Sequence, residues 1–264
     1  MHFPTIPVFG AMRRVYALMI FYGVILARLA ALPLAGLVIV TIGFDLIALA
    51  LGAQGAQPGW VIGVSLLGEL VAELLVMNFL AIRVFRLLLI EHDDERTVFD
   101  SSSLTRLGRY GGLHLGLIVS MALVLGAGWW LFQTLVPGMG TLGFGILLPF
   151  ALAAFAIYCA GSFVLPAASI PVPYRYQESF AAARGALVPI AMVTLVAVLP
   201  WFLLSWAVQT TSGAYVGPTS WVYWAILPLT TVLQCARTIS FAVANAVCFE
   251  ERTGWHPGAE KIEP

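Results

Sequence analysis

The sequence alternates between long apolar runs and short polar segments, a pattern typical of helices that cross a membrane repeatedly. An α-helix rises about 1.5 Å per residue and the hydrocarbon core of a bilayer is about 30 Å thick, so a spanning helix needs about 20 apolar residues. Six runs are long enough: 31–51, 60–82, 112–135, 143–165, 187–209 and 223–249. They predict an all-α integral membrane protein whose single transmembrane domain covers residues 1–264.

The composition agrees with this pattern and excludes a water-soluble protein. Of the 264 residues, 61% are hydrophobic and 10% are charged, and the mean hydropathy is +0.95. A soluble domain has about 45–50% apolar and about 25% charged residues. Thirteen basic residues balance thirteen acidic ones. A net charge of zero argues against nucleic acid as a partner, because nucleic-acid-binding proteins carry an excess of Lys and Arg.

The distribution of basic residues predicts the orientation of the spans. Segments on the cytoplasmic side of a membrane collect Lys and Arg. Basic residues precede the first span, lie between spans two and three and between spans four and five, and follow the sixth. The other connections, 52–59, 136–142 and 210–220, contain no charged residue. Both termini, including the tail 250–264, are therefore predicted to be cytoplasmic.

An additional apolar run, 15–27, lies between Arg14 and Arg28 near the N-terminus. It has three interpretations: a signal sequence or anchor, a seventh span, or a helix in the membrane interface. Its thirteen residues are too few to cross a bilayer. A seventh span would also place Arg28 outside, against the charge rule. We therefore expect an interfacial helix over 8–30.

Amphipathic, arginine-bearing stretches precede the three odd-numbered spans, at 8–30, 102–110 and 176–186. Three arginines, one from each stretch, are separated by equal intervals along the chain. Each is followed five positions later by a proline or a glycine, residues that break helices: Arg28 by Pro33, Arg106 by Gly111, and Arg184 by Pro189. The breakers predict turns from the interface into the membrane. We predict a pseudo-threefold repeat of one interfacial helix and two spans; the alternative is a chance match between apolar segments.

Four charged side chains fall at membrane depth: Asp45 in the first span, Glu69 and Glu73 in the second, and Arg237 in the sixth. Each costs about 2.5–3.5 kcal/mol near the centre of a spanning helix, so all four should face protein or water. Glu69 and Glu73 share one helix face because they are four residues apart. Counted along the helices, Asp45 and Glu69 lie at one depth, and Glu73 and Arg237 at another.

This buried ionisable cluster has two interpretations. Clustered carboxylates hold a proton more readily, which suits a proton or cation site. Alternatively, Glu73 and Arg237 form a buried ion pair, while Asp45 and Glu69 are protonated or hydrogen-bonded. The candidate hydrogen-bond partners are Thr41, Ser65, Asn78 and Gln234. We favour the ion pair, and we expect at least one neutral carboxyl group because three acids face one base.

Basic residues of the amphipathic stretches are candidate contacts for anionic lipid headgroups. They are Arg13, Arg14, Arg106, Arg109 and Arg184. The alternative, which we favour, is that these arginines only fix the orientation of the spans.

The sequence contains no signature of catalysis, cofactor binding or a metal site. Cys159, Cys235 and Cys248 show no metal-ligand spacing. His114 is the one histidine near membrane depth, so a haem held by two histidines lacks its second ligand. A phosphate-binding loop, a dinucleotide fingerprint and a zinc-protease motif are all absent. We therefore expect no enzymatic activity, no cofactor and no metal.

Two segments predicted to be cytoplasmic resemble a group of bacterial six-span membrane proteins. Segment 83–91, an Arg followed by an apolar run and a Glu, is similar to the segment after the second span of that group. Segment 165–168, with Ser179, Phe180, Arg184 and Gly185, is similar to the connection between its spans four and five. The group is related to the YciC-like proteins and to the membrane domains attached to glycerophosphodiester phosphodiesterases. The resemblance implies a bacterial inner-membrane protein of the predicted topology, and it supplies no catalytic residues.

These observations favour a non-catalytic component of the membrane, such as an accessory subunit, an assembly factor or another partner-binding protein. The expected partners are membrane lipids and other integral membrane proteins. The main alternative is a proton-coupled, ion-coupled, lipid or small-molecule permease that uses the acid cluster; an intramembrane enzyme is the third hypothesis. A polar path through the cluster would favour the permease, whereas dry packing around a paired cluster would favour the accessory role.

Overall fold

The computed structural model is all-helical over the residues that it describes, which are 4–52, 59–90, 101–135, 144–170, 174–211 and 220–256. The long helices are α2 (Gly23–Gly52), α3 (Gly59–Leu89), α4 (Ser101–Leu135), α5 (Phe144–Gly161), α8 (Leu187–Thr211) and α9 (Trp221–Thr253). The short helices are α1 (Val8–Phe21), α6 (Val164–Ser169) and α7 (Tyr176–Ala183). The predicted all-α class is confirmed for this part of the chain.

Helical segments within the described residues are long and apolar enough to cross a membrane. There are five: Gly23–Ile47, Leu104–Thr134, Leu147–Ser169, Leu187–Val208 and Trp221–Thr253. The protein is therefore a multi-pass membrane protein, as the apolar runs predicted. At 31 residues α3 is also long enough. It carries several charged side chains and is not one of the five, so its role as the sixth span remains a prediction.

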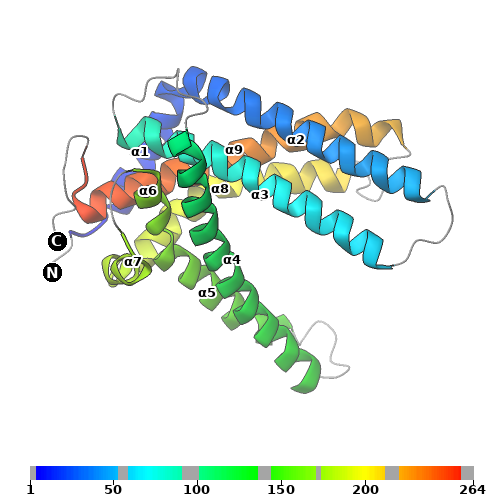
Figure 1. Ribbon diagram of the computed structural model, residues 1–264. Coiled ribbons are helices and arrows are strands. Elements are labelled where there is room, and N and C mark those ends of the chain that lie inside the picture. Colours follow the sequence, from blue (N-terminus) through cyan, green and yellow to red (C-terminus); the bar gives the residue numbers. More distant parts are fainter. Residues whose placement is uncertain are drawn as a thin grey trace.

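Consecutive long helices pack as antiparallel hairpins, α2 with α3, α4 with α5, and α8 with α9. Figure 1 shows α2, α3, α8 and α9 running side by side, while α4 and α5 diverge from them. Of the apolar stretch of α9, 67% is buried, compared with 11% to 33% for the other four candidate spans. α9 is therefore the central helix, and the other spans expose most of their apolar surface.

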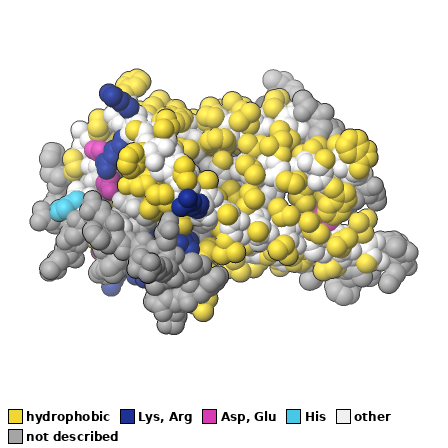
Figure 2. Space-filling model, turned by 90° about the horizontal axis from the view of Figure 1, so that it is seen from above, with side chains coloured by type: hydrophobic (Ala, Val, Ile, Leu, Met, Phe, Trp, Pro, Cys, Tyr) yellow, Lys and Arg dark blue, Asp and Glu magenta, His cyan; other side chains and the backbone are white. Residues whose placement is uncertain are grey.

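The surface of the molecule is divided between an apolar body and one charged end. In Figure 2 hydrophobic side chains cover the long body, and most of the visible charged side chains gather at the left end. Figure 1 places α1, α6 and α7 at this same end. An apolar body with charges concentrated at one end is the surface expected for a protein that lies within a bilayer.

The core lies at the charged end of the bundle, beside α6 and α7. The second half of α9, residues 242–249, is completely buried there. The ring of Phe249 makes edge-to-face contacts with Phe163 and Tyr174, each at 5.9 Å between ring centroids. Edge-to-face aromatic pairs add to the stabilisation from apolar burial. These contacts join α9 to the turn between α5 and α6 and to the segment that leads into α7.

Arg252, near the end of α9, ties three segments of the chain together. It is only 6% exposed, and its guanidinium donates hydrogen bonds to the carbonyl oxygens of Pro4, Ala182 and Arg184. A guanidinium carries five donors in a planar fork, so it can satisfy several carbonyl groups at once. The N-terminal segment, the end of α7 and the end of α9 are therefore held at one point.

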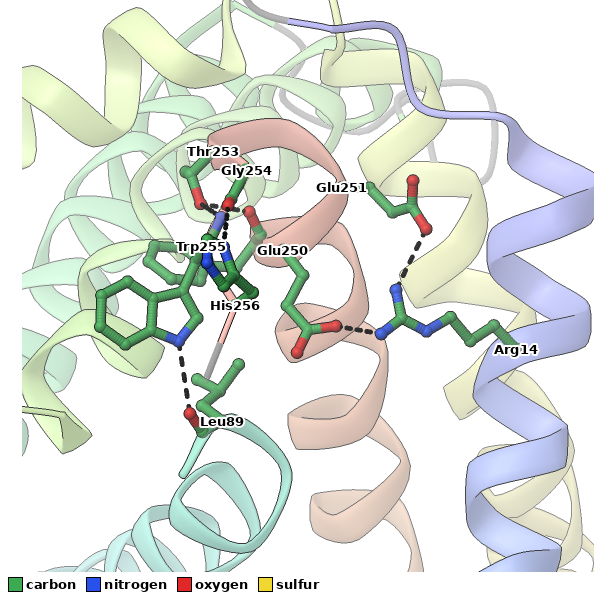
Figure 3. Close-up of polar contacts among 9 residues, drawn as sticks. Arg14, Leu89, Glu250, Glu251, Thr253, Gly254, Trp255 and His256 are labelled. Carbon is green, nitrogen blue, oxygen red and sulfur yellow. Dashed lines mark hydrogen bonds and ion pairs between the residues drawn. The ribbon is translucent and has the colours of Figure 1, made fainter. Parts of the chain in front are cut away.

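Further polar contacts at this end join α9 to α3 and to α1, as Figure 3 shows. Nε1 of Trp255 donates to the carbonyl oxygen of Leu89 over 3.3 Å. The guanidinium of Arg14 on α1 forms ion pairs with Glu250 and Glu251. Both contacts are made close to the residue where α9 ends, so α1 and α3 are both bound to this end of α9.

The boundaries of two predicted interfacial stretches differ from the structure. The predicted helix over 8–30 is divided at Tyr22, where ψ is 7°, and residues 23–30 belong to α2. The predicted stretch 102–110 is continuous with α4, which contains no proline. Separate short helices are formed by residues 8–21 of the first stretch, as α1, and by residues 176–183 of the third, as α7. The fourth predicted span, 143–165, is also interrupted, because α5 ends at Gly161 and α6 begins at Val164.

The prediction that Pro33 and Gly111 break their helices is wrong, because Pro33 lies inside α2 and Gly111 lies inside α4. Unsatisfied backbone groups cost several kcal/mol in an apolar medium, so a helix tends to continue through a single poor residue. Pro189 lies in the first turn of α8, where its missing N–H costs little. The turn before α8 uses Gly185, whose φ of +80° favours glycine.

Candidate functional site

A cavity of about 480 Å³ lies among the long helices. Helices α3, α4, α5, α8 and α9 all contribute to its wall, which is mainly apolar. The polar and charged residues in the wall are Glu73, Asn78, Tyr110, His114, Tyr158, Thr194, Gln234, Arg237 and Thr238. The volume falls within the range of about 300–1,000 Å³ that is usual for small-molecule sites. We call this space the central cavity.

The central cavity contains two members of the predicted ionisable cluster, Glu73 of α3 and Arg237 of α9. Both side chains are half-buried. Within the described part of the chain, they form no ion pair or hydrogen bond with each other. Among these residues, every fully buried side-chain nitrogen and oxygen has a hydrogen-bond partner. The charged groups of Glu73 and Arg237 are therefore not fully buried, both residues line the cavity, and the favoured ion pair is not formed.

The other two members of the cluster, Asp45 and Glu69, are not part of the cavity wall. The hydroxyl of Tyr223 on α9 donates to Oδ2 of Asp45 over 2.6 Å. Glu69 interacts electrostatically with its like-charged neighbours Glu73 and Asp45. The three acids thus form a series from Asp45 through Glu69 to Glu73, which ends at the cavity. Tyr223 was not among the partners expected for Asp45, because nothing in the local sequence links residues 178 positions apart.

Three polar residues of the cavity wall form a hydrogen-bonded chain that the sequence did not reveal. Nδ1 of His114 on α4 lies 2.6 Å from Oδ1 of Asn78 on α3, and Nε2 lies 3.1 Å from the hydroxyl of Tyr158 on α5. A neutral imidazole with its proton on Nδ1 satisfies both contacts, since it donates to Asn78 and accepts from Tyr158. The chain joins α3, α4 and α5. The only signal in the sequence was a polar residue within each of three apolar runs.

Asn78 and His114 also border a second cavity, of about 400 Å³, between α3 and α4. The rest of its wall consists of apolar side chains and the glycines Gly108, Gly111 and Gly112. Leu74, Asn78 and His114 therefore line both cavities.

A contact between α7 and α4 positions the wall of the central cavity. The phenol of Tyr176 donates to the carbonyl oxygen of Leu113, the residue before His114. Gly116 provides the space for this phenol, since a Cβ atom there would lie 2.8 Å from the Tyr176 oxygen. Burial raises the pKa of Tyr176 and of the neighbouring Tyr174 above the usual range. Both phenols therefore keep their protons at neutral pH.

The five arginines predicted to contact lipid headgroups lie in different environments. Arg14 is paired with Glu250 and Glu251, and its side chain is 44% exposed. Arg13, Arg109 and Arg184 are exposed, and Arg106 is half-buried. Contact of these residues with lipid headgroups remains a prediction.

No known protein family, curated protein or solved structure matches this chain. The resemblance to the YciC-like group therefore remains a prediction, and the function has to be inferred from the residues of the site.

Proposed function

We propose that this membrane protein binds an amphipathic molecule from the bilayer in the central cavity. The supporting observation is that Glu73 and Arg237 both face one mainly apolar cavity without pairing with each other. A charged group at membrane depth is costly unless another group compensates it. A bound molecule with a polar head and an apolar body would compensate the charges and cover the apolar wall. The proposal includes no catalytic step.

The sequence predicted two other functions, an accessory role and a permease. Dry packing around a paired cluster would have favoured the accessory role, whereas Glu73 and Arg237 line a cavity without pairing with each other. A cavity is sufficient for binding, whereas transport also requires a path to each side of the membrane. We therefore propose binding as the function.

Two substitutions on α8 test this proposal. Val198 lines the central cavity, whereas Leu203, on the same helix, is 51% exposed and is not part of its wall. Val198→Trp fills the cavity and is expected to reduce severalfold the lipid retained by the purified protein in mild detergent. Leu203→Trp is the matched control and should retain the wild-type amount. Extraction followed by mass spectrometry measures the retained lipid, and equal retention by both variants would refute the proposal.

A second candidate function, binding of other integral membrane proteins as an accessory or assembly component, is supported by α4. Only 11% of its apolar stretch is buried, and Leu123, Trp129 and Trp130 are each more than half exposed. This surface is available to a partner helix. Purification from native membranes in mild detergent is expected to recover a stoichiometric membrane partner. Recovery of the protein without any partner would contradict this role.

We also propose the finer topology: α3 is the sixth span, and both ends face the cytoplasm at a bacterial inner membrane. The hydrogen bond between Arg252 and Pro4 supports placing both ends on one side, as an even number of crossings requires. In this proposal α1 and α7 lie in the interface, and the three hairpins descend from one repeated unit. Single cysteines at Gln57 and Asp94, in a cysteine-free background, test the orientation with an impermeant reagent. Gln57→Cys should react in spheroplasts, and Asp94→Cys only after lysis.

A further inference from the structure

The two charges in the wall of the central cavity indicate the chemical class of its ligand. An anionic head would pair with Arg237 but would be repelled by Glu73. A cationic head would pair with Glu73 but would be repelled by Arg237. A head that carries both charges satisfies both side chains, and its net charge of zero matches that of the pair. Gln234 lies three residues before Arg237 on α9 and lines the same cavity. Its amide adds a donor for anionic oxygens.

Most other polar groups of the wall already have partners within the protein. Asn78, His114 and Tyr158 bond to one another, and the hydroxyl of Thr238 donates to the sulfur of Met77 over 3.3 Å. These groups do not require a ligand. The remaining polar residues of the wall are Glu73, Tyr110, Thr194, Gln234 and Arg237. Only Glu73 and Arg237 among them are charged, so their two charges are what a ligand has to compensate first.

The rest of the wall determines the body of the ligand. It is formed by apolar side chains from each of the surrounding helices, among them Leu70, Leu74, Phe155, Leu195, Val198 and Phe241. A fully polar zwitterion, such as a free amino acid, would leave this surface uncovered. A molecule with hydrocarbon chains would cover it and gain about 25 cal/mol for each Å² removed from water. The cavity has the size of a small-molecule site, so long chains would extend from it along α4 and α5.

Resting on the proposed function, we infer that the central cavity takes the zwitterionic head of a membrane phospholipid. The ammonium group of the lipid lies on Glu73, and its phosphate lies on Arg237 and Gln234. Arginine suits the phosphate because its planar fork donates two parallel hydrogen bonds. The carboxylate of Glu73 suits the ammonium group because it carries the opposite charge.

Competition between lipids tests the inference on the wild-type protein. Delipidated protein is offered equal amounts of phosphatidylethanolamine and phosphatidylglycerol in mixed micelles, and native mass spectrometry counts the bound molecules. We expect a preference of about tenfold for the zwitterionic lipid, equivalent to about 1.4 kcal/mol. Glycerophosphoethanolamine, which has the same phosphodiester head without hydrocarbon chains, should not compete. Equal binding of the two lipids, or displacement by glycerophosphoethanolamine, would overturn the inference.

Substitutions of the charged residues test the assigned contacts. Glu73→Gln should remove the preference by admitting the anionic lipid, and Arg237→Gln should weaken the binding of both lipids. The exchange Glu73→Arg with Arg237→Glu should restore the preference, because a zwitterion can bind in the reverse direction. Glu69→Gln is the matched control, since it makes the same change one turn away on α3 and outside the wall. Unchanged preference in Glu73→Gln would overturn the inference.

The outcomes separate the inference from the proposed function. If Val198→Trp reduces lipid binding while the wild type binds both lipids equally, the cavity binds lipid and the zwitterionic selectivity is refuted. If Val198→Trp leaves binding unchanged, both the proposed function and the inference fail. The wild-type competition needs no substitution, so a variant that fails to fold does not prevent the test.

Discussion

The hydroxyl of Tyr223 donates a 2.6 Å hydrogen bond to Asp45, and it thereby joins the first turn of α9 to α2. The first turn of α9 lies at the end of the bundle opposite the packed core (Figure 1). The hydrogen bond gives the Asp45 carboxyl group a donor at membrane depth, where water is scarce. This bond joins α2 to α9 at this end, while at the other end α9 is paired with Arg14 of α1.

Replacing Tyr223 by Phe removes this donor while keeping the ring. We expect a loss of about 1–3 kcal/mol in the free energy of unfolding, because a half-buried carboxyl group is left without its partner. Thermal unfolding in detergent measures the change. In an Asp45→Leu background the same substitution should have little effect. Equal effects in both backgrounds would show that the bond does not stabilise the protein.

The hydrogen bond between His114 and Asn78 predicts a strong coupling between these residues. His114→Leu should cost about 1–3 kcal/mol, because it leaves the buried Asn78 amide unpaired. The double variant with Asn78→Leu should recover part of this loss, because replacing both partners by apolar groups is nearly neutral. Chemical denaturation of the two single variants and the double variant gives the coupling energy. Additive losses would contradict the contact.

Two glycines of α4 provide a test of helix packing with an internal control. A Cβ atom at Gly116 would lie 2.8 Å from the Tyr176 oxygen, whereas one at Gly126 would meet no atom within 4 Å. Gly116→Ala should therefore destabilise the protein by about 1–3 kcal/mol through overpacking. Gly126→Ala should stabilise it by about 0.5–1 kcal/mol, since alanine favours a helix. Thermal unfolding compares the two, and similar effects would refute the close packing of α7 on α4.

Two arginines at the packed end should differ in their contribution to stability. Arg252→Gln removes donors from three carbonyl groups and is expected to cost about 3 kcal/mol or more. Arg14→Gln breaks ion pairs of a 44% exposed side chain and should cost about 1 kcal/mol or less. Hydrogen exchange should become faster around Ile6 in Arg252→Gln and change little in Arg14→Gln. Equal protection in the two variants would contradict the role of Arg252.

The sequence predicted the long helices well, because bilayer thickness and helical rise together determine their length. The fifth span was predicted at 187–209, and α8 runs from Leu187 to Thr211. The joints between elements were predicted less well. Pro33 and Gly111 were expected to break helices, but the backbone hydrogen bonds around them outweigh their poor helix propensity.

The candidate site could be predicted only in part from the sequence. Counting along the helices placed Glu73 and Arg237 at similar depth, and both do line one cavity. Counting residues along a helix gives depth only. It could not show that Glu73 and Arg237 remain unpaired, because that depends on how α3 and α9 are each rotated about their own axes. For the same reason the contact of His114 with Asn78 was not predicted, since it depends on the register between α3 and α4.

The hydrogen bonds of Arg252 have a consequence for how the protein is made. A ribosome synthesises Pro4 long before Arg252, because the two residues are 248 positions apart, and nascent chains grow at about 5–20 residues per second. The segment around Pro4 therefore lacks its final partner until α9 has been synthesised. The packed end closes only after that, and a chain that stops before Arg252 lacks the donor for the carbonyl oxygen of Pro4.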